Sequence, residues 1–194
     1  MQKAILETQY LKASLNCVSK ETARFYLCGV RITRKEGSLD IHYDATNGHT
    51  MFCARRADDD ELCTNGEIGL TIPTDTIKSA LKIAGTKART IELTVDDVCT
   101  LGDIRFNPID GSYPDVARVI PKDLSGNAGD FDAKYIADIG KALCSTRSHQ
   151  ITLYQNGERD PAVAFGTLED AFCVIVPCRV SRDHKIPTWA ADSR

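Results

Sequence analysis

One pattern of hydrophobic residues recurs three times along the chain and restricts its possible folds more than any other feature. Each unit combines a short strand, a helix of about three turns and two or three further strands. The three segments share little sequence, so the repeat is one of structure. We therefore expect an α+β fold of repeated strand–helix–strand units, with the helices on one face of antiparallel sheets.

The first unit opens with the alternating segment KAILET, and its helix places Leu11, Leu15 and Val18 on one apolar face. Three strands are predicted after it, at residues 29–33, 38–45 and 49–57. Asn47 and Gly48 separate the last two strands. Because both residue types tolerate positive φ, they predict a tight hairpin.

The second unit opens with a strand over residues 66–72, and Thr74 is a suitable N-cap for the helix that follows. Gly85 is expected to end this helix. Its predicted buried stripe consists of Ile77, Leu81 and Ala84. Further strands are predicted over residues 90–97 and within residues 99–110.

A polar connector over residues 121–130, with two glycines and a proline, is the best candidate for a boundary. The third unit follows it, with a helix over residues 131–143. The residues expected to face inward are Ile136, Ile139 and Leu143. Its strands are predicted within residues 151–157, 162–168 and 171–180.

Composition excludes several classes of protein. The chain has 194 residues, of which 42% are hydrophobic, enough for a substantial core. No apolar run approaches the ~20 residues of a membrane span, and the polar N-terminus MQKAILETQY is unlike a signal peptide, so we expect a cytoplasmic protein without membrane contact. The eight cysteines form no C-x-x-C pair, so we expect neither disulfides, a metal site nor a cofactor.

The distribution of lysines is more informative than the net charge of −3. Each of the three predicted helices carries lysines away from its apolar stripe. These lysines are Lys12, Lys20, Lys78, Lys82, Lys134 and Lys141. They form either ordinary solvated helix surfaces or a face that attracts an anionic partner.

The segment DATNGHTM, residues 44–51, combines an acid, a histidine and a turn glycine. Asp44, His49 and Cys53 supply the residue types of an orienting group, a base and a nucleophile. Residues so close along a hairpin usually point to different faces, however, and nothing in the sequence supplies an oxyanion site. We therefore expect no enzymatic activity, and His42 and His149 are most simply strand residues.

Four segments, taken together, resemble the bacterial DNA polymerase III beta sliding clamp in order and spacing. They are TARFYLCGV (22–30), DATNGHTM (44–51), DGSYPDVARVIP (110–121) and FCVIVPCRV (172–180). The resemblance implies the DNA-clamp fold, with residues 1–121 matching the middle domain of the clamp and residues 131–180 matching the second half of its last domain. A linker over 122–130 and a polar tail over 181–194 complete this division.

The resemblance also implies a function in DNA replication. Sliding clamps are rings that encircle duplex DNA without reading its sequence and tether polymerases as processivity factors, and the six helix lysines fit the lining of such a ring. Arg24 and Tyr26 match a family segment at the edge of the hole. If that segment is a strand, at most one of Phe25 and Tyr26 is buried.

In the family, the loop matching DATNGHTM forms one wall of a groove that captures peptides of polymerases and clamp loaders. The matching residues are Leu27, Thr46, Gly48, His49, Thr50 and Met51 on one side, Pro121 on the floor, and Val174, Ile175, Val176, Pro177, Cys178 and Arg179 on the other side. Asn47 and Thr50 replace the aspartate and arginine that the family usually has there. Ile186, Pro187 and Trp189 of the tail are candidate anchors for the same groove.

Family rings contain about a dozen strand–helix–strand units, and this chain holds about three. Four copies related by cyclic symmetry are therefore expected to close a homo-oligomeric ring. The alternative is a reduced clamp that does not encircle DNA, and that competes with or docks onto a full-length clamp or its partners.

Overall fold

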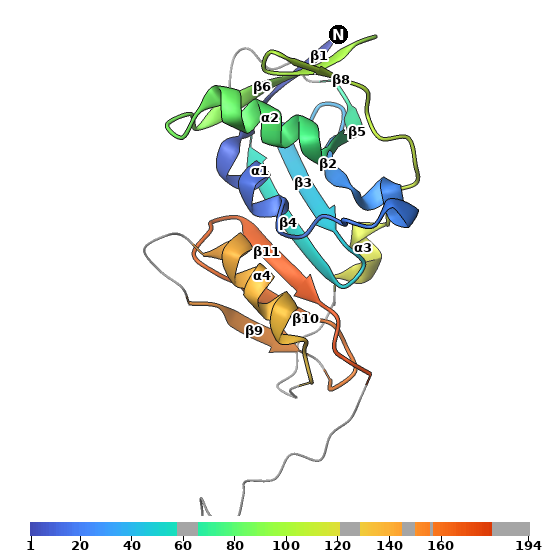
Figure 1. Ribbon diagram of the computed structural model, residues 1–194, viewed down its shortest axis with the longest axis vertical. Helices are drawn as coiled ribbons and strands as arrows, with labels where there is room; N and C mark the ends of the chain where they lie inside the picture. Colours follow the sequence, from blue (N-terminus) through green and yellow to red (C-terminus); the bar gives the residue numbers. More distant parts are fainter. Residues whose placement is uncertain (58–65, 121–128, 145–149, 156, 180–194) are drawn as a thin grey trace, which may run out of the picture.

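A computed structural model describes residues 1–57, 66–120, 129–144, 150–155 and 157–179 (Figure 1). We define unit one as residues 1–57, unit two as residues 66–106 and unit three as residues 129–179. Unit one contains β1 (Gln2–Glu7), α1 (Thr8–Ser14), a 3₁₀ helix η1 (Thr22–Leu27), β2 (Gly29–Arg34), β3 (Asp40–Thr46) and β4 (Thr50–Ala57).

Unit two contains β5 (Ile68–Pro73), α2 (Thr74–Ala84), β6 (Thr90–Val95), β7 (Cys99–Leu101) and β8 (Ile104–Phe106). A short helix, α3 (Val116–Val119), lies in the segment after β8. Unit three contains α4 (Ala133–Leu143), β9 (Thr152–Gln155), β10 (Ala162–Phe165) and β11 (Ala171–Ile175). The expected helix followed by two or three strands is confirmed in all three units. The expected opening strand is present in units one and two, but the described residues 129–132 before α4 form none.

The strands form two sheets, in which units one and two exchange their first strands. The four-stranded sheet has the order β1-β6-β7-β8, and the seven-stranded sheet has the order β5-β2-β3-β4-β11-β10-β9. Every pairing is antiparallel. Thus β1 of unit one pairs with β6 of unit two, while β5 of unit two pairs with β2 of unit one.

Unit three joins unit one through its last strand, because β11 pairs with β4 from Ala171↔Ala54 to Ile175↔Thr50. The helices α1, α2 and α4 lie on one side of the sheets (Figure 1). One hydrophobic cluster runs under all three helices and includes Leu11, Ile77 and Ile139, each fully buried. Burying a side chain of this size stabilises the fold by roughly 1.5–3 kcal/mol.

The opposite face of the seven-stranded sheet carries a second, smaller cluster. Met51, Cys53, Val163 and Val174 are buried there. Partly buried side chains of the segment around α3, Val116, Val119 and Ile120, pack on them. This second cluster therefore fixes the chain after β8 across the junction between units one and three.

The first helix and the segment after it differ in detail from the sequence-based expectations. α1 ends at Ser14, so Leu15 is its C-cap and Val18 lies beyond it, although Val18 remains buried. Residues 22–27 form a 3₁₀ helix and not a strand. Neither Phe25 nor Tyr26 is buried, which agrees with the expectation that at most one of them is. This 3₁₀ segment is six residues long and is kinked at Arg24, so its side chains do not alternate between two faces as those of a strand do.

The helix α2 also differs in detail from its prediction. Its N-cap is Pro73, and Thr74 is the first helical residue, whose hydroxyl donates to Cys28 O at 2.7 Å. Ala84 is exposed, and Ala80 is buried in its place one turn earlier. Gly85 ends the helix with a positive φ of 79°, as predicted.

Several predicted features lie outside the described residues. They are the linker residues 122–128, Pro121, His149 and the tail over residues 181–194. Within the described residues, none of the helices is long and apolar enough to cross a membrane.

Candidate functional site

A small apolar groove lies where units one and three meet, at the β3–β4 turn. Its volume is about 110 Å³. The residues that line it are Leu27, Thr46, Gly48, His49, Thr50, Met51, Pro114, Val119, Val174 and Val176. Residues from η1, the hairpin, the α3 segment and the end of β11 are thus brought together from four separate stretches of sequence.

The hairpin that forms one wall is held by its own polar side chains. Asn47 Oδ1 accepts hydrogen bonds from the backbone N–H groups of His49 and Thr50, each at 2.9 Å. The Thr46 hydroxyl donates to Thr50 O at 2.8 Å and accepts from Gly48 N at 3.1 Å. Gly48 has a φ of +87°, so this position favours glycine. The predicted tight hairpin is confirmed.

His49 links the hairpin to unit three. Its ring stacks on Tyr135 of α4, with centroids 5.1 Å apart and planes inclined by 12°. The backbone adds a second link, because Val176 N donates to His49 O at 3.1 Å. Desolvation, followed by the charges of Asp132 and Glu21, raises the pKa of Tyr135, so its hydroxyl stays neutral. The groove wall is thereby fixed across the junction.

The other predicted groove residues are placed differently. Ile175 is fully buried in the main core, because it alternates with Val174 and Val176 along the strand and faces the helices. Pro177, Cys178 and Arg179 follow β11 without lining the groove, and Cys178 N donates to Asp130 O at 2.6 Å. Pro121 lies outside the part of the chain that the structure describes.

Pro114 and Val119 line the groove but were not predicted to do so. Both lie in the segment DGSYPDVARVIP, which the sequence had already singled out. Tyr113 fixes this segment, because its hydroxyl donates to Asp44 O at 3.1 Å. Sequence spacing gives no means of knowing that the segment crosses the outer face of the sheet.

The set of Asp44, His49 and Cys53 does not assemble as a catalytic triad would. Asp44 and Cys53 are opposite each other in the β3–β4 register, whereas His49 lies at the turn, stacked on α4. Burial, together with the neighbouring Asp44, raises the pKa of the Cys53 thiol well above its usual range. A thiol held protonated is a poor nucleophile.

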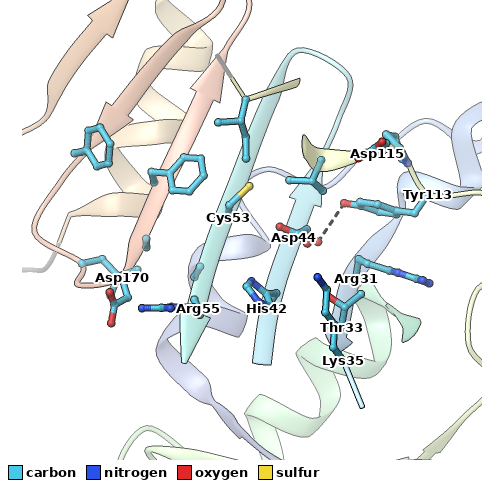
Figure 2. Close-up of a pocket in the computed structure, with 18 of the residues that line it drawn as sticks. Arg31, Thr33, Lys35, His42, Asp44, Cys53, Arg55, Tyr113, Asp115 and Asp170 are labelled. Atoms are coloured by element: carbon cyan, nitrogen blue, oxygen red, sulfur yellow. Dashed lines mark hydrogen bonds between the residues drawn. The ribbon is translucent and has the colours of Figure 1, made fainter. Parts of the chain in front are cut away.

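A larger cleft, of about 1230 Å³, lies on the outer face of the seven-stranded sheet (Figure 2). The residues that line it include the cations Arg31, Lys35 and Arg55 and the aromatic residues Phe165 and Phe172. At its floor Asp44 is only 8% exposed, and burial raises the pKa of this carboxyl to about 6 despite the Cys53 hydrogen bond and the charge of Arg31. The sequence did not predict this cleft. The segment around α3 forms part of its wall, and the alternation of residues along β2 to β4 does not show where that segment lies.

The six predicted lysines are all exposed, on helices or the loop after α1. Two of them have helix partners: Lys78 Nζ lies 3.7 Å from Asp75, and Lys141 Nζ lies 3.2 Å from Asp138. The helices α1, α2 and α4 lie on one side of the sheets (Figure 1), so we treat their exposed lysines as one candidate basic face. Lys87 and Arg89, exposed just after α2, were not predicted as part of it.

Arg24 and Tyr26 lie beside the groove. Arg24 Nε is 3.6 Å from Glu21, and a Cβ added to Gly48 would meet Arg24 Nη1 at 2.6 Å. Tyr26 is partly buried and packs edge-on against Phe25, with ring centroids 5.9 Å apart. Arg24 thus lies over the hairpin.

The chain is similar in sequence and in structure to bacterial beta sliding clamps. The beta sliding clamp of Caulobacter vibrioides (strain NA1000 / CB15N) is 29% identical over 117 residues, which cover 55% of this chain and 30% of the relative. The chain therefore matches under a third of that relative's length. No family model matches the chain.

Solved structures of sliding clamps superpose on most of this chain. The DNA polymerase III beta chain of Streptococcus pneumoniae TIGR4 has a TM-score of 0.75 at 17% identity, over 93% of this chain and 65% of the other. The beta subunit of Thermotoga maritima gives 0.75 at 13% identity, over 93% and 66%. Caulobacter crescentus pol III beta has a TM-score of 0.73 at 18% identity, over 93% of this chain and 66% of the other. The chain has the sliding-clamp fold, in a shorter form.

Proposed function

We propose that this chain is a short sliding clamp, a protein without chemistry of its own that encircles duplex DNA as a ring of identical copies. The observation that supports this function most strongly is that α1, α2 and α4 lie on one side of the sheets and each carries exposed lysines. Among the ion pairs of the described residues, none involves Lys12, Lys82 or Lys134. Lysines offer phosphates a mobile attraction that depends on salt and not on sequence, as sliding requires.

The groove supplies the second half of the function. Its apolar walls, from Leu27, Met51 and Val174, fit the apolar side chains of a short peptide, and the hairpin offers polar backbone groups at its rim. We infer that peptides of DNA polymerases and clamp loaders bind there. The division of the chain into a middle clamp domain and a half-domain fits this arrangement, because the groove lies at their junction.

Salt titration of duplex binding tests the DNA-facing role. Binding of the wild-type protein to duplex DNA should weaken linearly on a log–log plot of affinity against salt, with no preference for sequence. Reversing Lys82 and Lys134 to glutamate should flatten that slope. Reversing Lys35, a lysine in the outer cleft, is the matched control and should leave the slope unchanged. Equal effects of the two changes would refute the assignment of the helix face.

A non-encircling role is the second candidate. It is favoured by one observation: all the described residues that line the groove come from a single copy, so a ring is not needed to form them. Such a protein would compete with a full-length clamp for the same peptides. It would bind a polymerase-derived peptide as a monomer and show no retention on circular DNA.

A further inference from the structure

Unit three ends the seven-stranded sheet with an incomplete edge. In units one and two, the strand before each helix pairs with the first strand after the helix of the other unit, β1 with β6 and β5 with β2. β9 is the first strand after the helix of unit three, as β2 and β6 are in units one and two. The described residues 129–132 before α4 are not in a strand, and none of the described strands pairs with the outer edge of β9.

In the part of the chain that the structure describes, the edge at β9 also lacks features found at the other sheet edges. β1 carries Lys3 and Glu7, and β8 is three residues long and carries Arg105. On β5, Pro73 ends the strand and Ile109 N donates to Thr71 O at 2.9 Å. β9, with the sequence TLYQ, has no charge, proline or glycine, and an uncharged free edge favours pairing with another chain.

The side chains around this edge are exposed and largely apolar. Leu153 is 39% exposed and lies on the helix face of the sheet, since its partner Ala164 is in the main core. Tyr154, on the other face, is 48% exposed. An exposed leucine and tyrosine at consecutive positions of an edge strand give any pairing chain apolar area to cover on both faces.

The helix α4 leaves the same side open. Tyr135 of α4 stacks on His49 of unit one, so the flank with Tyr135 faces unit one. The opposite flank carries Ala133, Ala137 and Gly140, and a Cβ added to Gly140 would meet nothing within 4 Å. Such small residues allow a second helix to approach closely.

The geometry points to a second copy of this chain as the occupant of this edge: β9 of the two copies pairs antiparallel about a two-fold axis, and their α4 helices lie side by side. The described sheets favour such a contact, because units of this chain join one another through antiparallel strand pairs, units one and two through β1–β6 and β5–β2 and units one and three through β4–β11. Antiparallel pairing of a strand with its own copy obeys two-fold symmetry automatically.

The edge strand β8 of the four-stranded sheet suggests a second contact of the same kind. Units one and three meet through their last strands, β4 and β11, paired antiparallel. β8 is the last strand of unit two, so by this pattern its partner is the last strand of another unit two and not β9, although β8 offers only three residues for such a contact. A ring of four copies would then alternate two kinds of two-fold contact, in place of the cyclic symmetry expected from the sequence. This consequence rests on the proposed ring, whereas the β9 contact concerns the protein alone.

The test is the native mass of the purified full chain without DNA, by light scattering or sedimentation at several concentrations. Leu153→Glu places a charge on each side of the contact and should raise its dissociation constant at least about tenfold. The mass should halve, from tetramer to dimer or from dimer to monomer. Leu39→Glu, at a leucine 49% exposed away from β9, is the matched control and should leave the mass unchanged.

Three results would overturn the inference. The first two are a wild-type protein that is monomeric at about 100 μM and a native mass that Leu153→Glu does not change. The third is a tetramer that this variant converts directly to monomers, because a cyclic ring with one kind of contact would dissociate in that way. Circular dichroism establishes that the variant is folded, and Tyr154→Glu, on the opposite face of β9, replaces it if it is not. An intact tetramer that DNA does not retain would refute the proposed function and leave this contact standing.

Discussion

Replacing Asp44 with asparagine should stabilise the protein at neutral pH. This carboxyl lies at the floor of the outer cleft, 8% exposed, and burial is the main reason that its pKa rises from 3.8 to about 6. The Cys53 thiol and the charge of Arg31 oppose the rise without cancelling it. At about 1.4 kcal/mol for each pKa unit, the ionised carboxyl costs the folded state about 3 kcal/mol.

The sign follows from which state holds the proton more tightly. Because the pKa of Asp44 is higher in the folded protein than in the unfolded chain, its protonated form favours folding. The benefit is complete below about pH 3.8 and is lost as pH rises through about 6. Asp44→Asn removes this dependence, so the difference in stability between the variant and wild type should grow from near zero at pH 4 to about 2–3 kcal/mol at pH 8.

Urea denaturation at several pH values, followed by circular dichroism, measures that difference. Subtracting wild type from variant cancels the other carboxylates, which titrate in both proteins. Asp115→Asn, at an exposed aspartate beside Arg118, is the control and should show no comparable rise. A difference that stays flat from pH 4 to pH 8, or that falls, would show that Asp44 is not destabilised by burial.

The remaining predictions concern the groove, the helix face and the core. Met51→Glu, at a residue 3% exposed in the groove wall, should weaken binding of a polymerase-derived peptide at least about tenfold in fluorescence anisotropy, while duplex binding persists. Asp75→Ala frees Lys78, which lies 3.7 Å away, and should strengthen duplex binding at low salt; weaker binding would contradict the helix-face assignment. Ile139→Ala should destabilise the fold by about 2–5 kcal/mol in urea denaturation, because this side chain is fully buried between α4 and the sheet. A loss under about 1 kcal/mol would mean that unit three packs loosely on unit one.

The repeated architecture could be predicted from the sequence because it depends on local periodicity. Strands β2 to β4 and the Asn47–Gly48 turn follow from alternation and turn chemistry alone. The 3₁₀ helix at 22–27 could not, since its residues have no strong helical period and its form is set by neighbouring elements. Helix α2 shows the same limit, because tertiary packing chose Ala80 over Ala84 as the buried position.

The groove was only partly predictable for a related reason. Resemblance to the clamp family placed His49, Met51 and Val174 near one another, and the structure gathers them. Ile175 could have been excluded by strand alternation, since its neighbours Val174 and Val176 face the groove. Pro114 could not have been included, because its place depends on how the chain crosses the outer face after β8.

The most direct test of the proposed function is retention of the protein on a closed circle of duplex DNA. The protein is incubated with the circle and passed through a gel-filtration column at moderate salt, and half of the sample is cut with a restriction enzyme beforehand. A ring that encircles DNA stays with the intact circle and is lost from the cut molecule by sliding off its ends. Equal retention on both forms, or retention on neither, would contradict the ring.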